Sequence, residues 1–327
     1  LSCRKCRFER FQDILRRASE DNVPKPRVEL PDVVEGIETV AYADDVFETP
    51  RVSSPSFIDH TSHFICNPST SDTPTLDRMK IAYIKLCNAR RSAETGGLYY
   101  RASPHRLRNE KLTLRPCKYS YMVPYSHIFF FGVIDFAKAS FRDFDELCND
   151  EQHLFVKSNF QLIQALDGSY RANHHFPDDD TVMATYASFV SDDTLEQFFD
   201  DCPHKINKAE VVKHFRANMH RAIKLTKHEF RKVNPSIEEF VVLFGLALWN
   251  DYSAALSQEL ADLVRKQRAA ILKELQTVYS RQGYTHYALR IGVLLCLLAN
   301  EERVVELTNE DIQLYRMLNL FNEAYED

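Results

Sequence analysis

One segment of this sequence decides how its fold is interpreted, and it contains three short runs: Phe136-Ala137-Lys138, Phe144-Asp145-Glu146-Leu147 and Glu151-Gln152-His153-Leu154-Phe155-Val156-Lys157. The stretch 125–140 is apolar nearly all round, and apolar residues recur at helical spacing over 151–173. Both stretches are therefore predicted to be helices in the interior of the protein.

Each of these two helices carries a lysine, Lys138 or Lys157, at an end of the surface that they share. Two ammonium groups beside an apolar groove could bind the unpaired carbonyl oxygens at the C-terminus of a short docked helix. The alternative is that both are ordinary solvated lysines, whose stems lie on the surface while the charge stays in water.

Helical patterns continue on both sides of this segment. We expect a helix from about Thr75 to Ala93, ended by Gly96-Gly97. Ser236 and Glu239 form a capping box, which is expected to open another helix. Further helices are expected near 209, over 258–279, over 287–298 and from 308, with a β-turn within 181–190. Since glycine is scarce, at 8 residues, the sequence predicts an all-α fold class.

Charge is distributed unevenly along a chain whose net charge is −6. Residues 1–17 carry six Lys or Arg, whereas residues 18–48 carry nine Asp or Glu. Five prolines interrupt 21–60, where apolar periodicity is missing, so this stretch is predicted to be a linker. A basic start followed by an acidic spacer is typical of a nucleic-acid contact tethered to another domain.

The basic start contains Cys3-Arg4-Lys5-Cys6-Arg7. The Cys-x-x-Cys spacing allows two thiolates to reach one tetrahedral zinc ion, although such a site needs four ligands. Arg4, Lys5 and Arg7 suit contacts with phosphates. We interpret the segment as the end of a zinc module that begins further upstream; a chance pair of cysteines or a redox dithiol are the alternatives.

The sequence has no Gly-rich phosphate loop, nucleophile elbow or zinc-protease motif of the kind typical of enzymes. His174-His175 precedes an acidic stretch, 178–180, but adjacent histidines project in different directions, so we expect a solvated loop there. No apolar run is long enough to span a bilayer, and no secretory signal peptide is recognised. We therefore expect neither an enzyme nor a membrane protein.

The pattern Phe-Ala-Lys, Phe-x-x-Leu, Glu-Gln-x-x-Phe-Val-Lys over 136–157 resembles the signature of nuclear hormone receptor ligand-binding domains. The Cys3–Phe8 segment is similar to the end of the same family's DNA-binding domain, and the long divergent hinge resembles the nematode branch. The resemblance implies a three-layer antiparallel helical sandwich with a short N-terminal remnant of a zinc module. It divides the chain into that remnant (1–20), a hinge (21–74) and a ligand-binding domain (75–327).

The resemblance also implies roles for single residues. Cys3 and Cys6 match zinc ligands, and the basic residues beside them fall where the family contacts DNA phosphates. Lys138, Gln152 and Lys157 match the groove that binds a coregulator helix. These matches also imply zinc as the cofactor of the intact DNA-binding domain.

Two further matches concern the interior of the expected domain. Arg171 matches an arginine that holds the polar end of the ligand in some members of the family. Glu239 and Arg290 match a structural ion pair.

The implied function is that of a nuclear transcription factor, either ligand-regulated or an orphan, which binds a DNA response element and recruits coregulators. A small apolar ligand and a homodimer or heterodimer are further expected partners, and the 287–298 helix is the expected dimer surface because it is apolar. The alternative is a ligand-independent helical scaffold that binds only proteins, since aromatic residues make up 12% of the chain and could fill its interior.

Overall fold

The structure is a computed structural model that describes residues 71–99, 112–202, 208–250 and 258–317. All of these belong to one compact unit, Pro55–Asp327; a second unit, Leu1–Ser54, lies outside the described residues. The predicted zinc remnant and nearly all of the predicted hinge therefore lie outside them as well. The proposed domain boundaries stay a prediction, although the first described helix begins one residue before the expected start at 75.

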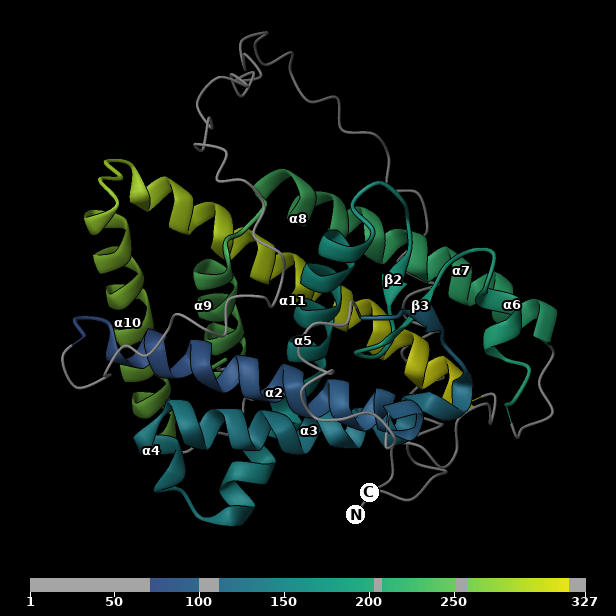
Figure 1. Ribbon diagram of the computed structural model, residues 1–327, viewed down its shortest axis with the longest axis horizontal. Coiled ribbons are helices and arrows are strands. Elements are labelled where there is room, and N and C mark those ends of the chain that lie inside the picture. Colours follow the sequence, from purple (N-terminus) through teal and green to yellow (C-terminus); the bar gives the residue numbers. More distant parts are fainter. Residues whose placement is uncertain (1–70, 100–111, 203–207, 251–257, 318–327) are drawn as a thin grey trace, which may run out of the picture. The chain divides into compact units, whose positions relative to one another are not determined.

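The described part of the chain is mostly helical (Figure 1). In chain order its elements are α2 (Pro74–Tyr99), β1 (Arg115–Pro116), α3 (Tyr119–Ser140), α4 (Arg142–Asp145), α5 (Asn149–His175), β2 (Val182–Met183), β3 (Ser188–Val190), α6 (Leu195–Phe198), α7 (Lys208–Leu225), α8 (Lys227–Val233), α9 (Ile237–Leu248), α10 (Gln258–Arg281) and α11 (Tyr287–Met317). This confirms the predicted all-α fold class.

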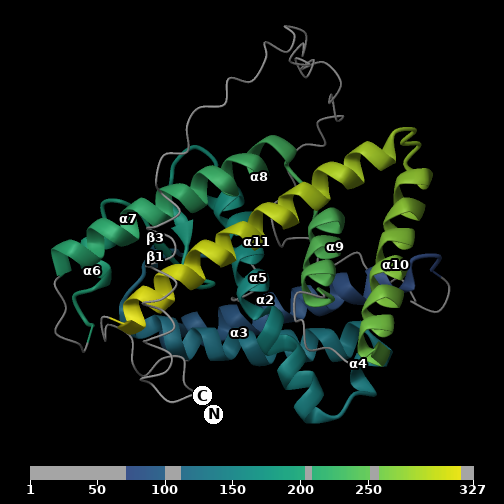
Figure 2. The ribbon, with the colours of Figure 1, turned by 180° about the vertical axis from the view of Figure 1, so that it is seen from behind.

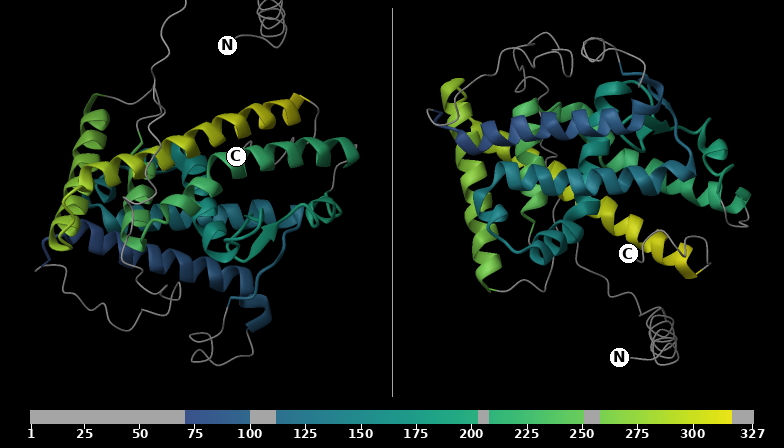
Figure 3. Two further views of the ribbon diagram at one scale, coloured as in Figure 1. Left: turned by 90° about the horizontal axis from the view of Figure 1, so that it is seen from above. Right: turned by 60° about the horizontal axis from the view of Figure 1, so that its bottom comes forward.

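The long helices are arranged in layers (Figures 2 and 3). Helices α2 and α3 lie side by side on one face, and α11 crosses the opposite face together with α7. Between them lie α5 and α9, which pack against each other and against both faces. Helix α10 packs against α9 and α2.

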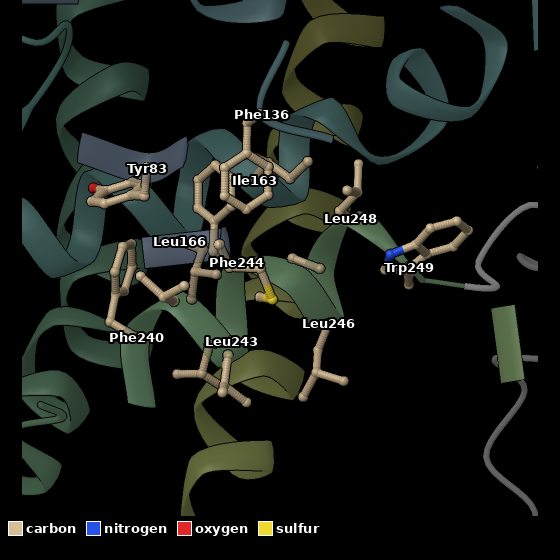
Figure 4. Packing of buried hydrophobic residues seen from close by; sticks show 14 of the residues in the cluster. Tyr83, Phe136, Ile163, Leu166, Phe240, Leu243, Phe244, Leu246, Leu248 and Trp249 are labelled. Atoms are coloured by element: carbon tan, nitrogen blue, oxygen red, sulfur yellow. The ribbon is translucent and has the colours of Figure 1, made fainter. Parts of the chain in front are cut away.

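Helix α9 lies at the centre of the core because nearly every side chain that it carries is apolar. The ring of Phe240 stacks on the ring of Tyr170 in α5, with 3.7 Å between their centroids. The ring of Phe244 packs edge to face against Phe136 of α3, with 4.8 Å between their centroids. Figure 4 shows Phe136, Phe240 and Phe244 within this cluster, and Trp249 directly after the helix. The capping box that was predicted to open α9 is present, since Ser236 and Glu239 each bond the other's backbone amide.

Three predicted helix boundaries were wrong. Helix α2 continues through Gly96 to Tyr99, because glycine weakens a helix by about 1 kcal/mol without necessarily ending it. Helix α3 begins six residues before the predicted 125 and includes Pro124. No new helix begins at Thr308, because this residue lies inside the continuous helix α11 and its hydroxyl donates to the Val304 carbonyl (2.9 Å).

The β-turn predicted within 181–190 is present as the β2–β3 hairpin, and β3 also pairs in parallel with β1. Pro116 of β1 can take part because β1 is an edge strand. Among the helices of the described residues, none combines the length and apolar character needed to cross a bilayer.

Candidate functional site

A patch of exposed apolar side chains lies where α3 meets α5. Phe131 of α3 is 56% exposed and Leu154 of α5 is 65% exposed. The Phe131 ring contacts His153 of α5 at 5.9 Å between centroids, and Phe130 contacts the same imidazole. We call Phe130, Phe131, His153 and Leu154 the α3/α5 patch.

Lys138 and Lys157 belong to the same two helices. Lys138 is half-buried in the last turn of α3, and Lys157 is exposed on α5, one turn after His153 and Leu154 of the patch. Both predicted groove lysines thus lie on the helices that form the patch. That their ammonium groups flank one groove stays a prediction.

Gln152 is buried, not part of the exposed surface. Its side-chain amide donates to the carbonyl oxygens of Phe144 (3.1 Å), Asp145 (3.4 Å) and Leu147 (3.0 Å). This residue therefore holds the α4 link against the start of α5.

Arg171 is fully buried in α5 and is engaged by the protein's own backbone. Its two terminal nitrogens donate to the carbonyl oxygens of Thr185 and Tyr186, in the turn of the β2–β3 hairpin. Its guanidinium also lies 3.9 Å from the centroid of the Tyr186 ring. The ligand-binding role expected of Arg171 stays a prediction.

Arg171 belongs to a larger group of buried charges that the sequence reading missed. Arg90 of α2 forms an ion pair with Asp167 of α5 (2.7 Å), and the Tyr83 hydroxyl donates to the same carboxylate (2.8 Å). Burial, together with the negative charge of Asp167, raises the pKa of Tyr83 well above its ordinary value. For Arg90, burial lowers the pKa but Asp167 outweighs it, so its pKa is raised and it stays charged.

Glu94 completes this group from the next turn of α2. Its carboxylate accepts hydrogen bonds from the Thr185 hydroxyl (2.6 Å) and from the backbone amides of Tyr186 and Ala187 (2.7 Å each). A signal was available in the sequence: positions 90 and 94 continue the apolar stripe 76, 79, 83, 86–87 at helical spacing, and charges in register with such a stripe are buried.

The expected ion pair between Glu239 and Arg290 is present. Two guanidinium nitrogens of Arg290 donate to the two carboxylate oxygens of Glu239, each at 2.7 Å. Burial raises the pKa of Glu239, but the Arg290 bonds outweigh it, and its pKa is lowered overall. The pair joins α9 to α11 and has a structural role.

The zinc and phosphate residues predicted from the sequence, Cys3, Cys6, Arg4, Lys5 and Arg7, lie outside the described residues. Within the described ranges, no group of three or more His, Cys, Asp or Glu side chains could hold a metal ion.

Comparison with known proteins gives a family match over most of the described unit. Residues 109–318 match the family model described as the ligand-binding domain of nuclear hormone receptor. The chain is 24% identical over 195 residues to high zinc activated nuclear receptor protein of Caenorhabditis elegans, covering 58% of this chain and 47% of that protein. It is 22% identical over 289 residues to nuclear hormone receptor family member nhr-16 of the same organism, covering 85% and 72%. The chain thus spans about half the length of the first relative.

Proposed function

We propose, from the premise that this chain belongs to the nuclear hormone receptor family through its ligand-binding domain, that it acts as a transcription factor of the nuclear receptor type. The family match over 109–318 and the nematode relatives confirm the resemblance recognised in the sequence. Proteins of this family are generally transcription factors rather than enzymes, and we infer the same for this chain.

We further propose that the α3/α5 patch binds a short amphipathic helix of a coregulator protein. The exposure of Phe131 and Leu154 on two helices that pack against each other supports this proposal, together with the contact of the Phe131 ring with His153 beside Leu154, because exposed apolar groups can mark a protein interaction site. Lys138 and Lys157 would bind the carbonyl oxygens at the C-terminus of the docked helix. The apolar contacts supply most of the affinity, and the lysines set the direction of the helix.

A labelled peptide with the pattern Leu-x-x-Leu-Leu, which places its leucines on one face of a helix, tests this proposal by fluorescence polarisation. Leu154→Asp is expected to weaken binding by about tenfold or more, because it places a charge in the apolar contact. Lys138→Ala and Lys157→Ala are each expected to weaken it by about three- to tenfold.

Lys213→Ala is the matched control, because Lys213 is an exposed lysine on α7. It should leave the affinity unchanged in the same buffer. Equal losses for Lys213→Ala and the two patch lysines would show a general charge effect and refute the proposed site, as would an unchanged affinity in Leu154→Asp.

DNA binding is proposed for the full-length protein, in the nucleus, through a zinc module to which Cys3 and Cys6 contribute two ligands. Arg4, Lys5 and Arg7 would contact phosphates. The support is the family match together with the spacing and charge of residues 1–7. In a mobility-shift assay with the full-length protein, Cys6→Ser should abolish a shift that a zinc chelator also abolishes; a shift unaffected by both would contradict this proposal.

A second candidate function is the ligand-independent interaction scaffold. It is favoured by one observation: the guanidinium of Arg171 donates to backbone carbonyls in the β2–β3 turn. Native mass spectrometry of the purified protein separates the two candidates. A co-purified small molecule supports the ligand-regulated receptor, and its absence in a protein that binds the peptide supports the scaffold.

A further inference from the structure

Two arginines of the buried charge group face the same aromatic ring. The guanidinium carbon of Arg171 lies 3.9 Å from the centroid of the Tyr186 ring, and that of Arg90 lies 5.2 Å from it. Both arginines and the tyrosine are at most 5% exposed. An aromatic ring attracts a cation through its negative face, and this attraction is strongest where water is excluded.

One N–H group of each of these arginines has no hydrogen-bond acceptor among the described residues. The Nε–H groups of Arg90 and Arg171 have no hydrogen-bond partner among the described residues, although both are buried. A buried donor without an acceptor is costly, so a nearby π face is a useful substitute. Arg90 has a second such face, since it lies 3.7 Å from the centroid of Phe129.

The backbone around Tyr186 is also bonded to the buried charges. Glu94 accepts from the amides of Tyr186 and Ala187, and Arg171 donates to the carbonyls of Thr185 and Tyr186. Strands β2 and β3 contain only two and three residues, so they supply few ladder bonds of their own. The turn is therefore positioned chiefly by the charges of α2 and α5.

We propose that Tyr186 is an internal ligand of this domain, whose ring occupies an aromatic-binding cage formed by Arg90 and Arg171. The cage takes a planar aromatic ring of the size of a phenol, and the chain supplies it. The domain then completes its interior without a small molecule. This last step rests on the proposed function, because it makes recruitment of a coregulator helix independent of added ligand.

Removal of the ring should turn the cage into a binding site. Tyr186→Ala leaves a buried space of the volume of a phenol, and such spaces bind small aromatic molecules. The probe is phenol, which reproduces the part of the tyrosine side chain beyond Cβ, and cyclohexanol is its saturated counterpart. Melting is followed by the fluorescence of Trp249, which is buried and is the only tryptophan of the chain.

At about 10 mM probe, phenol is expected to raise the Tm of Tyr186→Ala by about 3 °C, and cyclohexanol by clearly less. The wild-type protein should respond to neither, since its cage is filled. Tyr170→Ala is the matched control: this ring is also buried, but it stacks on Phe240 and not on a guanidinium, so its cavity should favour the aromatic probe less than the cavity of Tyr186→Ala does. Equal shifts for wild type and Tyr186→Ala, or equal shifts with both probes, would overturn the proposal.

Two milder variants decide the matter if Tyr186→Ala does not fold. Tyr186→Phe keeps the π face and should melt within about 2 °C of the wild type, whereas Tyr186→Leu keeps apolar bulk without the face and should melt several degrees lower. Equal melting temperatures for these two variants refute the cage.

Whether the cage affects coregulator recruitment is measured separately, as binding of the Leu-x-x-Leu-Leu peptide. The wild-type protein should bind it without added small molecule, and phenol should restore binding to Tyr186→Ala. If the wild type does not bind the peptide, the proposed function fails while the melting result on the cage still stands. If the wild type binds and Tyr186→Ala binds equally well without phenol, the cage has no part in recruitment.

Discussion

Replacement of Glu301 by glutamine is expected to stabilise this domain, and to do so most at neutral and alkaline pH. Glu301 lies in α11, is 0% exposed, and neither carboxylate oxygen has a hydrogen-bond partner among the described residues. Burial raises the pKa of this carboxyl from 4.5 to about 8 and outweighs the opposing influence of the nearby Ser169 hydroxyl, which donates its hydrogen bond to Thr226. The folded protein therefore keeps Glu301 as a neutral acid at pH 7, whereas the unfolded chain ionises it.

The direction of the pH dependence follows from these two pKa values. An acid that binds its proton more tightly in the folded state destabilises the fold increasingly as the pH rises from the unfolded pKa to the folded pKa. For Glu301 that window runs from pH 4.5 to about 8. Since a tenfold change in proton affinity is worth about 1.4 kcal/mol, the cost at pH 7 is about 3 kcal/mol. Glutamine has the shape of the neutral acid, so Glu301→Gln should recover most of this free energy of unfolding. The recovered free energy corresponds to a rise in Tm of about 6–12 °C.

The assay is urea unfolding of wild type and Glu301→Gln at about pH 5, 7 and 8.5, followed by Trp249 fluorescence. The gain should be below about 1 kcal/mol at pH 5 and should rise through pH 7. Glu302→Gln is the control; this neighbour is half-buried and accepts a hydrogen bond from Asn250, which a glutamine oxygen can also accept. A gain that is the same at all three pH values, or a loss at pH 7, would refute the reasoning.

Three further predictions follow from other contacts. Ser236→Ala removes the cap of α9 and should lower the free energy of unfolding by about 1 kcal/mol in urea titrations, whereas Ser236→Thr should not. Arg290→Met leaves Glu239 buried without its cation and should cost about 3–5 kcal/mol; the double variant with Glu239→Leu should recover part of this loss in the same titration. If α11 forms the dimer surface, Leu289→Glu, which changes a side chain that is 63% exposed, should weaken self-association by at least about tenfold in sedimentation velocity without lowering Tm; an unchanged sedimentation profile would exclude this face.

The helices could be predicted because their signals are local. The apolar period places α2, α5 and α10, and the pair Ser236 and Glu239 marks the first turn of α9. Thr308 shows where such local signals fail. A Thr followed three residues later by an acid resembles a cap, but the same hydroxyl can bond the carbonyl four residues before it inside a helix. The sequence permits both arrangements, and the structure has the second.

The candidate surface was predicted only in part. Lys138 and Lys157 were recognised from the family pattern, which fixes their positions on two helices but not the exposure of neighbouring rings. Phe131 and Leu154 belong to stretches that read as interior, and only the crossing of α3 and α5 leaves them at the surface. The role of Gln152 was equally invisible, since its three acceptors are backbone carbonyls in the link.

The position of the β2–β3 hairpin illustrates a physical limit of sequence reading. β-propensity predicts a turn within 181–190, but not what the turn contacts. Its site is selected by charges on other elements, Glu94 of α2 and Arg171 of α5, because each of them would lie buried without these partners if the turn were elsewhere. Loss of one partner of a buried charge costs about 3–5 kcal/mol, which exceeds what a two-residue ladder contributes. The position of the hairpin therefore depends on its bonds to the buried charges. Substitutions at Glu94 should displace the hairpin before they unfold the helices.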